Sequence, residues 1–169
     1  IFPTAIGINL SIFFNMLLAA IFMYFLAFEL TDNYYSAICA AIVYSLAGFS
    51  ATVIFYGHLT IINSIPYLAG GFYALLKLQK TLKFKYSFFL AINFALQFFA
   101  GQPQFLFYSV FANFLFFCFL IITAENINRL KFSGLYIIAG GLMFVIIYPY
   151  YSEVNAYLKT TVRAETLGN

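Results

Sequence analysis

The sequence predicts an all-α protein, a polytopic transmembrane helical bundle of about six helices, one or two of them broken or re-entrant. Of its 169 residues, 64% are hydrophobic and 8% are charged, whereas soluble domains carry roughly 25% charged residues. The mean hydropathy is +0.96. Apolar stretches of about 20 residues, the length needed to cross a bilayer, follow one another along the chain. This composition excludes a soluble globular domain and a disordered chain.

The first two apolar stretches, residues 6–28 and 36–56, are each long enough to span a membrane. In the second, small residues recur about once per helical turn, which lets a neighbouring helix backbone approach closely. This packing stripe consists of Ala37, Ala41, Ser45 and Gly48. We expect the pairs Gly70-Gly71 and Gly140-Gly141 to serve helix packing in the same way.

The remaining stretches differ in length and continuity. Residues 59–78 form the third, which Pro66 interrupts by removing one backbone donor. The fourth, residues 86–100, is only fifteen residues long. It gives roughly 22 Å of helix, short of the ~30 Å hydrocarbon core. Residues 105–123 and 132–148 are the fifth and sixth.

The domain organisation expected is a bundle over residues 1–150 followed by an extracytoplasmic juxtamembrane segment over residues 151–169. The chain begins with Ile rather than Met and ends in a polar segment, so we expect a fragment of a larger membrane domain. We expect no signal peptide in this sequence, because no basic segment precedes the first apolar stretch and no cleavage site follows it. The two cysteines, Cys39 and Cys118, lie inside apolar stretches and are expected to be packing residues.

Basic residues in short loops predict the orientation, because they favour the cytoplasmic side. The loops after the third and fifth stretches lie on one side, and the other side has only Lys159 and Arg163. We therefore place the two basic loops in the cytoplasm. Their basic residues are Lys77, Lys80, Lys83, Lys85, Arg129 and Lys131.

Polar breaks gather on the opposite, extracytoplasmic side. The sequence Gly101-Gln102-Pro103-Gln104 lies between two apolar stretches, and such a break is tolerated in lipid only where protein buries it or water reaches it. The short fourth helix should leave this break recessed. On the same side lie Tyr56-Gly57-His58 and everything after Tyr148. The convergence of these polar breaks on one side predicts a functional site there.

Five residues on that side are candidates for substrate binding. His58 suits phosphate binding or proton transfer near neutral pH. The amides of Gln102 and Gln104 suit sugar hydroxyls or phosphate oxygens. Glu153 suits a proton or a metal ion, and the planar guanidinium of Arg163 matches a phosphate. The alternative for each is an ordinary polar residue at the membrane interface.

Other polar residues inside the helices are expected to form interhelical hydrogen bonds rather than to bind ligands. These residues are Asn9, Asn15, Asn93, Gln97 and Asn113. No nucleotide-binding glycine loop, zinc motif or hydrolase nucleophile elbow is present, and no basic, aromatic-rich surface indicates nucleic acid. No metal site or cofactor is evident from the sequence.

The order of the short motifs resembles that of the bacterial YfhO family of multi-pass membrane proteins, which is similar in plan to GT-C glycosyltransferases. In chain order the motifs are Tyr44-Ser45-Leu46-Ala47-Gly48-Phe49, Gly57-His58, Pro66, Ala100-Gly101-Gln102-Pro103-Gln104 with Tyr108, and Tyr148-Pro149 leading to Glu153 and Arg163. The family loop reads Gly-His-Pro-Gln, and this chain has Gln102 in the second place.

The resemblance implies a partial GT-C-like fold in the bacterial cytoplasmic membrane. It implies transfer of a sugar from a polyprenyl-phosphate carrier to a cell-envelope acceptor on the extracytoplasmic face. The main catalytic carboxylate of such enzymes lies in the first extracytoplasmic loop, which is expected to precede Ile1, so the catalytic residues in this chain are unknown. A divalent metal ion in the complete protein is compatible with this chemistry.

Two alternatives remain open. Broken helices beside a cavity also suit a transporter or flippase for a lipid-linked substrate. A non-catalytic membrane subunit that binds partner membrane proteins is the other alternative. In every case membrane lipid is an expected partner.

Overall fold

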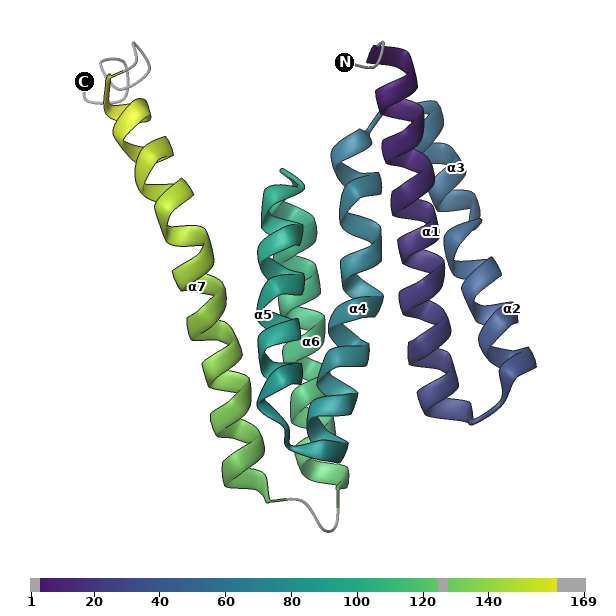
Figure 1. Cartoon of the computed structure of the whole chain (residues 1–169), viewed down its shortest axis with the longest axis vertical. Helices are drawn as coiled ribbons and strands as arrows, with labels where there is room; N and C mark the ends of the chain where they lie inside the picture. Colours follow the sequence, from purple (N-terminus) through teal and green to yellow (C-terminus); the bar gives the residue numbers. More distant parts are fainter. Residues whose placement is uncertain (1–3, 125–127, 161–169) are drawn as a thin grey trace.

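The computed structural model describes residues 4–124 and 128–160 as a bundle of helices aligned along one long axis (Figure 1). The helices are α1 (Thr4–Thr31), α2 (Tyr34–Ser45), α3 (Gly48–Phe55), α4 (Leu59–Thr81), α5 (Phe84–Phe99), α6 (Pro103–Thr123) and α7 (Arg129–Thr160). No strand occurs in the described part. Five segments, with α2 and α3 taken together as one, are long and apolar enough to cross a membrane. The chain is therefore a multi-pass membrane protein, and the predicted all-α bundle is confirmed.

Local sequence explains where several helices begin and end. Asn33 starts α2, because its side-chain oxygen accepts hydrogen bonds from the backbone N–H groups of Tyr35 and Ser36. At the end of α4, Leu82 adopts a left-handed conformation with φ of 50°. Pro103 occupies the first turn of α6, where its missing N–H has no intrahelical acceptor to lose.

Helix α4 lies at the centre of the bundle and packs on α1, α5 and α6. The apolar core extends from α4 through α5 to α6 and α7, and includes Leu75, Leu90 and Phe132, all fully buried. The ring of Phe117 stacks on that of Tyr136 with centroids 4.2 Å apart, joining α6 to α7. Helix α4 also contacts α3 and α7, so it connects the helices that surround the cavity described below.

Small residues bring the helices together, largely as predicted. Ala37, Ala41 and Ser45 are buried on the face of α2, which packs on α1. A Cβ atom added to Gly70 or Gly71 would meet side-chain atoms of α5 or α6, respectively. The prediction is wrong for Gly140-Gly141, where such an atom would meet nothing within 4 Å. That pair lies on a loosely covered part of α7.

The second predicted helix is broken. Instead of running through residues 36–56, it stops at Ser45 and resumes as α3 at Gly48. The hydroxyl of Ser45 donates to the carbonyl of Ala41 at 2.8 Å, a local bond that competes with regular helix and often bends it. Ala47 is extended, with ψ of 149°, and its side chain supplies no cap to α3.

The last helix is longer than predicted. The sequence suggested an end at Tyr148, before Pro149, with a juxtamembrane segment over residues 151–169. The structure continues α7 through Pro149 to Thr160, so residues 151–160 belong to the helix, and residues 161–169 lie outside the described part. A proline removes one backbone hydrogen bond without ending every helix. The hydroxyl of Ser152 also donates to the carbonyl of Pro149.

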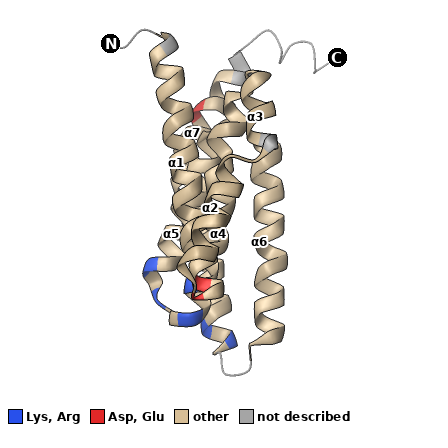
Figure 2. Cartoon of the chain, turned by 90° about the vertical axis from the view of Figure 1, so that its right-hand side faces the viewer, with Lys and Arg blue, Asp and Glu red and all other residues tan. Residues whose placement is uncertain are grey.

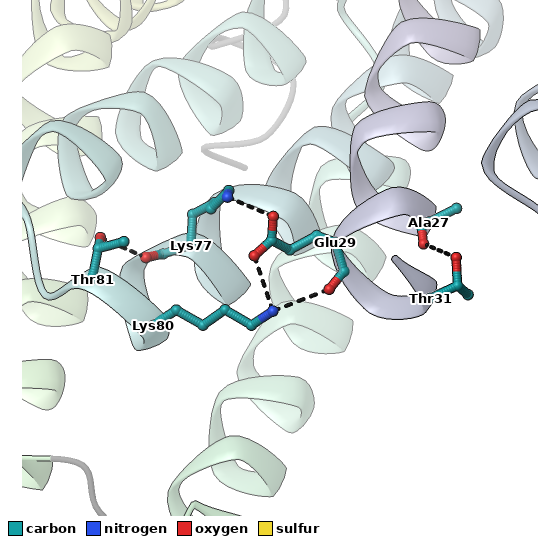
Figure 3. A network of polar contacts seen from close by, with 6 residues as sticks. All are labelled: Ala27, Glu29, Thr31, Lys77, Lys80 and Thr81. Atoms are coloured by element: carbon teal, nitrogen blue, oxygen red, sulfur yellow. Dashed lines mark hydrogen bonds and ion pairs between the residues drawn. The ribbon is translucent and has the colours of Figure 1, made fainter. Parts of the chain in front are cut away.

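Charge separates the two ends of the bundle. Figure 2 shows Lys and Arg gathered at one end, which we call the lysine end; the other is the opposite end. At the lysine end, Glu29 of α1 lies between two lysines of α4 (Figure 3). Its carboxylate is 2.5 Å from Lys77 Nζ and 2.9 Å from Lys80 Nζ, and Lys80 also donates to the Glu29 carbonyl. This group fastens α1 to α4.

Candidate functional site

Two polar turns meet at the opposite end of the bundle. One turn joins α3 to α4, the other joins α5 to α6, and each contains a glycine with positive φ: Gly57 at 72° and Gly101 at 81°. The hydroxyl of Thr60 donates to Gln102 Oε1 at 3.2 Å. A Cβ atom on Gly101 would lie 3.6 Å from Thr60 Cγ2. The two turns, 42 residues apart in the chain, are therefore in direct contact.

The α5–α6 turn is recessed, as its sequence predicted. Helix α5 has 16 residues, fewer than a full span requires. In Figure 1 the turn that follows α5 lies below the ends of α1 and α7 at the opposite end. Polar groups of this turn therefore lie deeper along the bundle axis than those ends.

The five candidate binding residues are not all brought together. Gln102 is half-buried and bonded to Thr60, whereas His58, Gln104 and Glu153 are exposed. Within the described residues, no hydrogen bond or ion pair joins any of these three side chains to Gln102. Arg163 lies outside the described residues.

The backbone of His58 forms the start of α4 in the α3–α4 turn. Its carbonyl accepts hydrogen bonds from the backbone N–H groups of Ile61 and Ile62, at 3.1 and 3.3 Å, so it starts α4. Its imidazole makes no capping bond and lies beside the Tyr56 ring, with centroids 6.5 Å apart. The ring remains exposed and is accessible to a ligand at this end.

A cavity of about 380 Å³ lies deeper along the same helices, between the α2–α3 break, α4 and α6. Its wall is mostly apolar and contains no charged residue among those described. Tyr108 of α6, 60% exposed, is part of that wall. The polar residues of the wall are Tyr44, Ser50, Ser64, Gln97, Tyr108 and Ser109.

Buried amides connect α4, α5 and α6 next to this cavity. Gln97 Nε2 donates to Ser109 Oγ at 2.7 Å and to the Ser64 carbonyl at 3.3 Å. One turn earlier on α5, Asn93 Nδ2 donates to the Tyr67 carbonyl at 2.6 Å. These bonds confirm that Gln97 and Asn93 are interhelical hydrogen bonders. Asn113 differs, because its Nδ2 donates to the carbonyl of Ser109 on its own helix.

Three buried acceptor atoms have no donor among the described residues. They are Asn93 Oδ1, Gln97 Oε1 and Asn113 Oδ1. An unsatisfied buried acceptor is costly, so each such atom requires an explanation. Of the three amides, only Gln97 belongs to the cavity wall.

Sequence reasoning did not find the cavity. The available signals were Gln97 and Ser109 within apolar helices, together with Ser45 three residues before Gly48. A serine close to a glycine is a common position for a helix kink. The relative rotation of α2, α4, α5 and α6 brings these residues together, and the sequence alone does not determine that rotation.

Among the residues with described positions, no group of three His, Cys, Asp or Glu side chains is arranged to hold a metal ion. Comparison of the chain with protein-family models, curated proteins and solved structures gives no match. The two turns and the cavity are therefore the features of this chain that bear on its function.

Proposed function

We propose that this chain is part of a YfhO-like protein of the bacterial cytoplasmic membrane that transfers a sugar from a polyprenyl-phosphate carrier to a cell-envelope acceptor. The observation that supports this most is the contact between the two polar turns at Thr60 and Gln102, in a recess at the end opposite the lysines. By the positive-inside rule, that end faces away from the cytoplasm.

The chemistry assigns binding rather than catalysis to these residues. The amides of Gln102 and Gln104 donate to sugar or phosphate oxygens, and the exposed imidazole of His58 lies in the neighbouring turn. In the reaction, the acceptor hydroxyl loses its proton to a carboxylate and attacks the sugar C1. The bond from C1 to the phosphate oxygen breaks, and the carrier phosphate leaves with the electron pair. In GT-C enzymes that carboxylate lies in the first extracytoplasmic loop; we assign the role to no residue of this chain and assign no step to a metal ion.

A transfer assay with the full-length protein in lipid nanodiscs tests this function. A radiolabelled polyprenyl-phosphate sugar is supplied with cell-envelope acceptor, and transfer is compared between native protein and the double variant Gln102→Ala, Gln104→Ala. Hydrogen bonds to charged groups are worth about 1.5–3 kcal/mol, so kcat/KM should fall roughly 10- to 100-fold. The control, Asn128→Ala, lies at the lysine end and caps the start of α7, where its side chain accepts from Lys131 N. Native protein that neither binds nor consumes any polyprenyl-phosphate sugar would contradict the proposal.

A transporter or flippase is the second candidate, and the break between α2 and α3 supports it. Discontinuous membrane helices beside a cavity are common at transporter binding sites. Helix α2 ends at Ser45 and α3 begins at Gly48, and Ala47 between them is part of the cavity wall. Alternating access predicts that thiol labelling of Gln102→Cys and Gln104→Cys changes when a lipid-linked substrate is added. Labelling that is identical with and without substrate would exclude this mechanism.

The non-catalytic subunit has less support. A subunit of this kind would bind its partner protein through the packing stripe of α2. In this chain Ala37, Ala41 and Ser45 of the stripe are already buried against other helices of the same chain.

A further inference from the structure

The cavity beside Gln97 lies where a membrane lipid can enter it. Helix α3 packs on α4, and α6 packs on α4 and α5, so α3 and α6 flank the cavity with α4 as its back wall. Tyr108 on α6 belongs to the wall and is 60% exposed on the outside of the bundle. The volume, about 380 Å³, is within the usual range of ligand sites, about 300–1,000 Å³.

Among the buried side-chain atoms that the structure describes in this wall, the Gln97 oxygen has no hydrogen-bond partner. The Tyr44 hydroxyl donates to the Ile65 carbonyl, and the Ser64 hydroxyl donates to the Thr60 carbonyl, both at 2.8 Å. The Gln97 amide nitrogen is used by Ser109 and Ser64, which fixes the orientation of the amide. Its oxygen therefore faces away from those partners, and no described donor reaches it although the residue is 0% exposed.

The chemistry of the wall selects the kind of ligand. Apolar side chains favour a hydrocarbon chain, and an unpaired carbonyl oxygen requires a hydrogen-bond donor. None of the described residues of the wall is a cation, so a phosphate would be buried there without a counter-charge. The carrier phosphate of the proposed reaction accordingly belongs at the turns around Gln102, not in this cavity.

We propose that the cavity binds an uncharged membrane lipid with a long apolar chain and a hydroxyl group that donates to Gln97 Oε1. The bound lipid satisfies the orphaned acceptor and occupies the space between α3 and α6. This site is separate from the two polar turns, and it does not depend on the transfer reaction.

Two matched photoaffinity probes test this site on the full-length protein in nanodiscs. One is a long-chain alcohol with a diazirine in its chain and an alkyne tag; the other is its methyl ether, which cannot donate a hydrogen bond. The alcohol should label residues of the cavity wall about three- to ten-fold more than the ether, the ratio expected for one net hydrogen bond. Gln97→Met should abolish this preference. The control Asn113→Leu removes a buried amide outside the wall and should preserve it.

The labelling results distinguish a lipid site from a cavity that holds no such lipid. Equal labelling by alcohol and ether in the native protein would overturn the proposal, since the acceptor would then be satisfied by internal water. Labelling confined to residues outside the wall would overturn it as well. If Gln97→Met does not fold, Ala112→Phe fills the cavity without changing the amide. That variant should lose wall labelling by both probes, and persistent labelling would contradict the site.

Discussion

The close approach of α4 to α5 at Gly70 makes a sharp mutational prediction. A Cβ atom added at Gly70 would collide with Asn93 Oδ1 and would lie 2.8 Å from Cδ2 of Phe22. Asn93 is held by its bond to the Tyr67 carbonyl, and Phe22 packs edge-on against Phe89 with centroids 5.8 Å apart. Neither neighbour can move without losing a contact, so Gly70→Ala should destabilise the bundle.

The size of the effect follows from three contributions. Alanine favours a helix over glycine by about 1 kcal/mol. Overpacking a well-packed interior costs about 1–3 kcal/mol. Displacing Asn93 sacrifices a hydrogen bond worth about 1 kcal/mol. The net expectation is a loss of about 1–3 kcal/mol in the free energy of unfolding.

The matched control is Gly140→Ala on α7, where the added atom meets nothing within 4 Å. It should be neutral or stabilising by up to about 1 kcal/mol. Both variants are unfolded by SDS titration from mild detergent in a Cys39→Ser background, and unfolding is followed by maleimide labelling of the half-buried Cys118. If Gly70→Ala is as stable as Gly140→Ala, the close approach of α4 and α5 is refuted.

Three further changes have defined outcomes in the same assay. Glu29→Gln should cost up to about 1 kcal/mol by weakening its two ion pairs, and the loss should shrink in 0.5 M salt. Tyr44→Phe should cost about 1 kcal/mol through its bond to the Ile65 carbonyl, whereas Tyr148→Phe, at an exposed position, should cost less than half as much. Asn63→Leu should cost about 1–3 kcal/mol, because its Oδ1 accepts from two side chains of α1. If either hydrogen-bond variant is as stable as the native protein, the corresponding hydrogen bond does not stabilise the bundle.

Much of the fold was predictable because membrane helices obey simple length and hydropathy rules. The apolar stretches and the short α5 appear in the structure, and so does a break after α5. The break is shorter than the predicted residues 101–104, because α6 begins at Pro103 and Gln104 lies in its first turn. The basic loops lie at one end, as the alternation of short connections required. Each of these features can be predicted from local sequence and the order of the segments along the chain.

The features that sequence did not predict depend on competition between local bonds and packing. Pro149 seemed to end the last helix, but the loss of one backbone bond did not outweigh continuation to Thr160. In the second span, the Ser45 hydroxyl bonds its own helix, and the chain breaks before Gly48. Pro149 and Ser45 are each compatible with a helix that continues and with a helix that ends.

The candidate site was predictable only in part. Polar residues were expected to gather at one end, and the contact between Thr60 and Gln102 is consistent with that. The cavity was not foreseen, because Gln97 reads in sequence as a packing amide and its unpaired oxygen depends on where Ser109 lies. The relative rotation of helices decides such a feature, and short motifs do not encode it.

Carrier binding at the two polar turns is tested directly by photocrosslinking of a radiolabelled polyprenyl-phosphate sugar to a photoreactive amino acid placed at position 102. The same amino acid at position 128, at the lysine end, is the comparison. A carrier site at the two polar turns predicts a crosslink at position 102 that excess unlabelled carrier abolishes, and none at position 128. Crosslinking that is absent at position 102, or equal at both positions, would contradict a carrier site at the two polar turns.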